Sequence, residues 1–130
     1  MGKEIDLLAK YPKAKRNLED RANTKTDKER VVARKFGKDF FDGDRKFGYG
    51  GYNYHPKFWS EVVNTFADHW KLDGNNSLLD VGCGKGFMIY DFYKLIDNIK
   101  LYGIDISKYA IENCHQEIKS LVKVGNAKKL

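Results

Sequence analysis

Leu78-Leu79-Asp80-Val81-Gly82-Cys83-Gly84-Lys85-Gly86-Phe87 is the stretch that decides the fold of this chain. A short apolar run, typical of a buried parallel strand, leads directly into three glycines spaced two residues apart. An amphipathic helical pattern begins at Phe87. Strand, glycine turn and helix in this order form the entry to a nucleotide-type site in a doubly wound α/β sheet.

The spacing of the glycines excludes two common phosphate-binding loops. A P-loop requires a Gly-Lys-Ser/Thr ending, whereas Lys85 is followed by Gly86. A dinucleotide fingerprint reads G-x-G-x-x-G, whereas this loop reads G-x-G-x-G. Asp80 also places negative charge where a pyrophosphate would lie. The loop therefore favours a ligand that carries positive charge.

These ten residues resemble the first motif of class I (Rossmann-like) S-adenosylmethionine-dependent methyltransferases. S-adenosyl-L-methionine has a sulfonium, an ammonium group and no phosphate, which suits the acidic residue before the glycines. The resemblance implies that this cofactor is bound. Its methionine part would lie against Asp80 and the backbone of Gly82, Cys83, Gly84 and Gly86.

The next predicted strand, residues 99–106, ends in an acidic residue twenty-five positions after Asp80. At the tip of the second strand of a βαβ unit, a carboxylate can accept hydrogen bonds from both hydroxyls of a ribose. Asp105 has that place. The resemblance assigns Ile106, the following residue, to the adenine.

A third apolar run, residues 121–124, ends in Gly125-Asn126-Ala127. It resembles the family's third-strand segment, where a polar residue meets the adenine amino group. Asp is common there in the family, and Asn126 still offers a carbonyl acceptor. The resemblance therefore assigns Asn126 and Ala127 to the adenine as well.

Together these patterns predict an α/β fold, the N-terminal half of a doubly wound Rossmann-like parallel sheet with three strands, preceded by helices. We expect a basic N-terminal arm (1–25), lead-in helices with an aromatic, Gly-rich loop (26–76), and a partial cofactor-binding domain that ends after the third strand (77–130). The family's sheet has seven strands, so we expect a natural protein that is longer. The family's residues around the nucleophile commonly follow the fourth strand, so no catalytic residue is predicted here.

Helix signals surround the strands. Thr26-x-x-Glu29 reads as a capping box, followed by apolar Val31, Val32 and Phe36. Pro56 opens a helix whose broad apolar face we expect to lie against the sheet. After the glycines, a buried stripe is predicted at Phe87, Met88, Phe92, Leu95 and Ile96. Ser107 is predicted to cap a further helix.

Residues 40–55, here called the aromatic segment, mix aromatic side chains with glycines and show no helical period. The segment fits a lid over a nucleoside or a flat substrate. It equally fits an irregular linker whose rings cover apolar surface. Tyr49 and Tyr52 are the candidate lid residues, and Arg45 is a candidate for an acidic substrate group. His55, just before a helix, is expected to form local hydrogen bonds.

The formal net charge of +6 is concentrated near the start, where residues 1–40 hold twelve Lys and Arg against seven Asp and Glu. Because acids and bases are interspersed there, a small-molecule acceptor is favoured over nucleic acid. The two cysteines have no His or Cys at metal-binding spacing, so no metal site is predicted. No run approaches the roughly 20 apolar residues of a membrane span. We expect a cytoplasmic protein with reduced cysteines; its oligomeric state is left open.

The predicted function is S-adenosylmethionine-dependent methyl transfer to a small acceptor, with the 130-residue chain alone expected to be inactive. Three alternatives stay open: a catalytically silent cofactor-binding or interaction module, an NAD-type oxidoreductase half-domain, and an RNA methyltransferase. The spacing of the glycines and the position of Asp80 disfavour the oxidoreductase.

Overall fold

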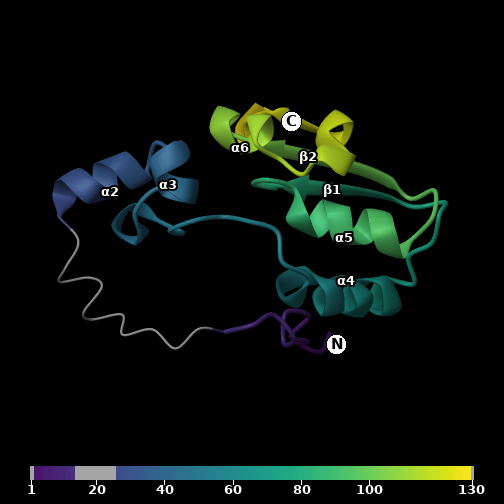
Figure 1. Ribbon diagram of the computed structural model, residues 1–130. Helices are drawn as coiled ribbons and strands as arrows, with labels where there is room; N and C mark the ends of the chain where they lie inside the picture. Colours follow the sequence, from purple (N-terminus) through teal and green to yellow (C-terminus); the bar gives the residue numbers. More distant parts are fainter. Residues whose placement is uncertain (1, 14–25, 130) are drawn as a thin grey trace.

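A computed structural model describes residues 2–13 and 26–129 of the chain. Three parallel strands, β1 (Ser77–Val81), β2 (Lys100–Asp105) and β3 (Val122–Val124), form one open sheet in the order β1-β2-β3. The prediction of a three-stranded parallel α/β sheet with preceding helices is thus confirmed (Figure 1). Part of the predicted basic arm, residues 1 and 14–25, lies outside the described residues, as does Leu130.

The described residues also form helices and 3-10 turns. They are α2 (Asp27–Ala33), α3 (Lys38–Asp42), η1 (Arg45–Phe47), α4 (Pro56–Trp70), α5 (Phe87–Leu95), α6 (Lys108–Glu112), η2 (Gln116–Leu121) and η3 (Ala127–Lys129). The α3 helix and η1 show that the aromatic segment contains short helical turns, although its sequence has no helical period.

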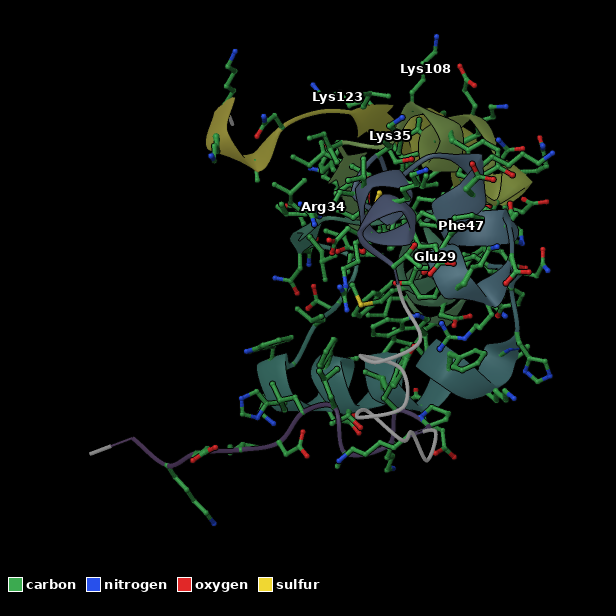
Figure 2. The ribbon with its side chains drawn as sticks, turned by 90° about the vertical axis from the view of Figure 1, so that its left-hand side faces the viewer. Glu29, Arg34, Lys35, Phe47, Lys108 and Lys123 are labelled. Atoms are coloured by element: carbon green, nitrogen blue, oxygen red, sulfur yellow. The ribbon has the colours of Figure 1, made fainter. Side chains whose placement is uncertain are left out.

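The predicted helix starts are confirmed by their hydrogen bonds. The Glu29 N–H donates to Thr26 Oγ1 at 3.2 Å and the Thr26 N–H donates to Glu29 Oε2 at 2.8 Å, which completes the capping box of α2. His55 accepts from the Lys57 N–H at the start of α4. Ser107 Oγ accepts from the Ala110 N–H at the start of α6. In Figure 2, Glu29 lies beside η1, where Lys46 Nζ is 4.0 Å from its carboxylate.

The layers are stacked in the order sheet, α5, α4 (Figure 1). The prediction that α4 lies against the sheet is therefore wrong, because α5 lies between them. Ile89 and Phe92, both fully buried, show how α5 fills this middle layer. A Cβ on Gly103 of β2 would come within 2.5 Å of Ile89, while the Phe92 ring lies 6.3 Å from that of Phe66 on α4. Because α5 is buried on two sides, the single apolar stripe predicted for this helix did not include Ile89.

Other predicted apolar stripes are only partly buried. Leu95, in the last turn of α5, is 42% exposed, and Val31 on α2 is 52% exposed. No residue of α2 is buried, so this short helix rests on the surface of the molecule. The helix capped by Ser107 is short and ends at Glu112. The buried Ile118 belongs to the separate 3-10 turn η2.

One face of the sheet is largely uncovered. Connections between neighbouring parallel strands are almost always right-handed. Because the strand order is β1-β2-β3, two right-handed connections place both of their helical segments on the same face of the sheet. On the opposite face, Leu79, Val81 and Tyr102 are 47%, 47% and 53% exposed. Among the described residues, no strand pairs with the outer edge of β1. No helix in the described part of the chain is long and apolar enough to cross a membrane.

We predict that Phe92→Ala will lower the free energy of unfolding by about 3–5 kcal/mol, because it empties a fully buried ring site. Urea denaturation followed by circular dichroism measures this change. Tyr93→Ala on the same helix is the matched control, since Tyr93 is 48% exposed. Equal losses in the two variants would contradict the layer order described above.

Candidate functional site

The three glycines after β1 adopt backbone conformations that other residues rarely reach. Gly82, Gly84 and Gly86 have φ angles of +82°, +57° and +76°. A Cβ on Gly82 would meet nothing within 4 Å, whereas a Cβ on Gly86 would lie 2.4 Å from Ile118 Cδ1. The turn is therefore open at its first glycine and tightly packed at its last. Open backbone at Gly82 leaves room for a ligand to approach closely.

Cys83 faces the interior. It is 5% exposed, and its Sγ would lie 2.9 Å from a Cβ on Gly103. Burial, together with the charges of Asp80 and Asp105, raises the pKa of the Cys83 thiol to about 12. The Cys83 side chain is therefore not available to a ligand. Its backbone is engaged as well, because the N–H groups of Cys83 and Gly82 both donate to the Ile104 carbonyl and the Cys83 carbonyl accepts the Gly86 N–H.

Asp105 joins the ends of all three strands. Its Oδ2 accepts the Gly84 N–H and its Oδ1 accepts the Ser107 N–H, each at 2.8 Å. Its backbone carbonyl accepts the Gly125 N–H at 2.9 Å, next to the end of β3. Each carboxylate oxygen keeps a second lone pair. Asp105 therefore organises the glycine turn and can still accept hydrogen bonds from a ligand.

Asp80 is close to Asp105, and its carboxylate has no hydrogen bond or ion pair with any described residue. Burial, and secondarily the charge of Asp105, raise the pKa of the Asp80 carboxyl to about 6. An acid that is desolvated beside a second acid is costly to ionise. A bound cation would offset that cost, so the electrostatics of this pair favour a positively charged ligand.

The third-strand residues lie beside Asp105 but bond locally. Asn126 Oδ1 accepts the Lys128 N–H at 2.9 Å, which closes a small turn at the start of η3. Ala127 is the first residue of η3, and Ile106 is 60% exposed. The hydrogen bond from Gly125 to Asp105 places this turn at the same sheet edge as the glycines.

The aromatic segment is fastened to the glycine turn through Asp42, a residue that the sequence analysis did not single out. Lys85 Nζ lies 2.7 Å from Asp42 Oδ2, and the Tyr109 hydroxyl donates to the same oxygen at 2.5 Å. The Tyr52 N–H donates to Oδ1 at 2.8 Å. Burial alone would raise the pKa of Asp42, but these donors hold it below its ordinary value. The one signal in the sequence was Lys85 itself, since a cation among packed glycines requires an acidic partner.

A second attachment lies at the other end of the aromatic segment. The Tyr54 hydroxyl donates to Asp91 Oδ1 at 2.5 Å and accepts from Lys94 Nζ at 2.8 Å. Asp91 is 3% exposed and sits on the otherwise apolar inner side of α5. Its Oδ2 has no hydrogen-bond partner among the described residues. Tyr54 and Asp91 were also absent from the predicted site residues.

Between these attachments, aromatic rings cover the glycine turn. A Cβ on Gly84 would lie 3.1 Å from Tyr52 Cε1, so the Tyr52 ring rests directly on the turn. Tyr49 stacks on Tyr52 with ring centroids 4.6 Å apart, and Phe87 lies 4.8 Å from Tyr52 on the other side. Arg45 is turned away from the turn and donates to the Gly48 carbonyl of its own loop. The structure therefore brings Tyr49 and Tyr52, but not Arg45, to the glycines.

Comparisons with known proteins agree with this arrangement. Residues 72–128 match a family model described as a methyltransferase domain. These residues form a class I methyltransferase-like domain. The match includes β1, the glycine turn and both acidic residues, and it supports methyl transfer in general as the activity of the methyltransferase-like domain. No curated protein and no solved structure matches the chain. Within the described residues, no group of three His, Cys, Asp or Glu could hold a metal ion.

We predict that Asp42→Asn will lower the free energy of unfolding by about 3 kcal/mol at neutral pH, because it leaves Lys85 buried without its counter-charge. The pKa of Asp42 is depressed in the folded chain, so its contribution is present above the ordinary pKa of 3.8 and is lost as the pH falls further. Urea denaturation at pH 7 and at pH 3 tests both statements. Asp39→Asn, on the exposed side of α3, is the control, and an equal loss there would rule out the ion pair as the cause.

Whereas ionised Asp42 stabilises the folded chain, the ionised Asp80 carboxylate is predicted to destabilise it. Because its pKa is raised in the folded chain, ionisation lowers stability as the pH rises from 3.8 to about 6. Asp80→Asn should therefore raise the free energy of unfolding at pH 8, by at most about 3 kcal/mol, and should have little effect at pH 3.5. A variant that is less stable than the parent at pH 8 would show that the carboxylate has a stabilising partner.

Proposed function

We propose that the methyltransferase-like domain binds S-adenosyl-L-methionine over the glycine turn and takes part in methyl transfer to a small acceptor. The observation that carries this proposal is the pair Asp80 and Asp105, which flank an open glycine backbone; in the part of the chain that the structure describes, no cation is paired with Asp80. A sulfonium and an ammonium group supply the missing positive charge.

Each residue near the turn has a part in this proposal. Asp80 would receive the ammonium group of the cofactor, and the backbone at Gly82 would lie along its methionine part. Asp105 would accept the ribose hydroxyls with its remaining lone pairs. Ile106, with its exposed side chain, and the turn at Asn126 and Ala127 would border the adenine.

Catalysis in such a site depends mainly on orientation and on exclusion of water. The cofactor, when bound, supplies a methyl group already activated by its sulfonium. The chain contributes a turn fixed by Asp105 and a cover of rings, Tyr49 and Tyr52, held in place through Asp42. A fixed cover lowers the entropy that is lost when two reactants are aligned. It also keeps water away from the charges.

The acceptor and the location are further parts of the proposal. A small-molecule acceptor is supported by the limited space in a cavity that Tyr52 and Phe87 help to line, which measures about 210 Å³. A cytoplasmic location is supported by Cys83 and Cys114, which are both buried and unpaired.

Isothermal titration calorimetry with S-adenosylhomocysteine and with NAD tests the cofactor assignment. We expect the former to bind and the latter not to bind, because NAD would place its pyrophosphate beside Asp80. Asp105→Asn should weaken S-adenosylhomocysteine by about 1–3 kcal/mol, the scale of a hydrogen bond to a charged group. Asp97→Asn, an exposed carboxylate at the opposite end of α5, should leave it unchanged. Binding of NAD alone would favour the oxidoreductase instead.

A further inference from the structure

A small cavity lies against the aromatic segment on the side of α4. It measures about 210 Å³ and is lined chiefly by six rings. These are Tyr11, Tyr49, Tyr52, Phe58, Trp59 and Phe87. Sites for drug-sized ligands span roughly 300–1,000 Å³, so this cavity fits a compact group rather than a whole nucleoside.

Apart from the stacked pair Tyr49 and Tyr52, the rings meet at angles instead of forming one flat stack. Tyr11 is tilted 60° from Trp59 at a centroid distance of 4.9 Å, and Tyr52 is tilted 45° from Phe87 at 4.8 Å. Rings arranged in this way present several π faces around one volume. The negative faces of Tyr and Trp attract ammonium groups, and quaternary ammonium ligands are bound by such aromatic boxes.

The charges around the cavity also favour a cation. Among the described residues that line it, none is a Lys, Arg, Asp or Glu. Tyr52 rests on the glycine turn that follows Asp80, since a Cβ on Gly84 would lie 3.1 Å from Tyr52 Cε1. Burial, then the hydroxyls of Tyr49 and Tyr11, then the charge of Asp80 raise the pKa of Tyr52. Lys85, whose Nζ lies 5.9 Å from the Tyr52 centroid, is neutralised by Asp42 at 2.7 Å.

Two wall residues already have an ammonium group over their rings. Lys57 Nζ is 5.0 Å from the Phe58 centroid, and Lys85 Nζ is 5.9 Å from the Tyr52 centroid. Neither lysine lines the cavity. These two lysines make cation–π contacts with wall rings from outside the cavity, and a ligand cation would make the same kind of contact from inside it.

We propose that this aromatic cavity binds a compact organic cation of the alkylammonium class. Tyr52 and Phe87 belong both to the cavity wall and to the surroundings of the glycine turn. A cation held there could anchor the molecule that receives the methyl group, a role that rests on the proposed function. Binding of the cation itself does not depend on that function.

Choline chloride is the probe, and 3,3-dimethylbutan-1-ol is its uncharged counterpart of nearly the same shape. The chain contains two tryptophans, so Trp70→Phe leaves Trp59 as the single fluorophore, located in the cavity wall. In this background at pH 8, we expect choline to change the Trp59 emission in a saturable manner. The uncharged alcohol should bind at least about tenfold more weakly, because it lacks the cation–π attraction.

Tyr49→Leu tests the ring directly, since Tyr49 is 49% exposed and its removal leaves the core intact. It should weaken choline about tenfold or more, whereas Tyr93→Leu, an exposed ring on the remote part of α5, should not. Equal affinity for the alcohol, no saturable response to choline, or an equal loss in Tyr93→Leu would each overturn the cation site. S-adenosylhomocysteine is titrated separately, so failure of the cofactor assignment would be seen independently of this result.

Discussion

The carboxylate of Asp105 is the interaction on which the rest of this structure depends. It accepts the Gly84 N–H from the turn after β1 and the Ser107 N–H at the start of α6, and its carbonyl accepts the Gly125 N–H after β3. One residue at the end of the middle strand therefore aligns the ends of all three strands. Since parallel sheets bind ligands beyond these ends, the same bonds that order the fold also shape the candidate site.

Asp80 has a different role beside it. Asp105 is surrounded by donors, whereas Asp80 is desolvated and faces another acid, with its pKa raised to about 6. A fold optimised for stability alone would not keep an acid in such surroundings, and perturbed acids of this kind gather at functional sites. The difference between the two carboxylates distinguishes a residue that builds the turn from one that is available to a ligand.

The parts of this fold that could be predicted from the sequence depend on local patterns. The apolar run before Gly82, the capping box at Thr26 and the cap at Ser107 each act within a few residues, and the structure bears them out. The positions of Asp80 and Asp105 followed from βαβ spacing, although their roles toward a cofactor stay predictions. Layer order was mistaken because the apolar pattern of α4 shows that it is buried but not which element it is buried against.

The unpredicted parts depend on contacts between distant residues. Lys85 and Asp42 are separated by 43 positions, and Tyr54 and Asp91 by 37. No periodicity links such pairs, so a single sequence gives no sign of them. The choice between lid and linker for the aromatic segment was open for the same reason. Its rings lie on the glycine turn and its ends are attached by hydrogen bonds, which describes a fixed cover more closely than a loose connection.

The first and last glycines of the turn, Gly82 and Gly86, are constrained for different reasons. At Gly86 an added methyl group would collide with Ile118 inside the molecule, so the demand comes from folding. At Gly82 the same methyl group would meet no atom of the described residues within 4 Å, so there the demand comes from the backbone angle. Within five residues, one glycine is thus constrained by the packed interior, and another by its backbone angle alone, with its outer side left accessible.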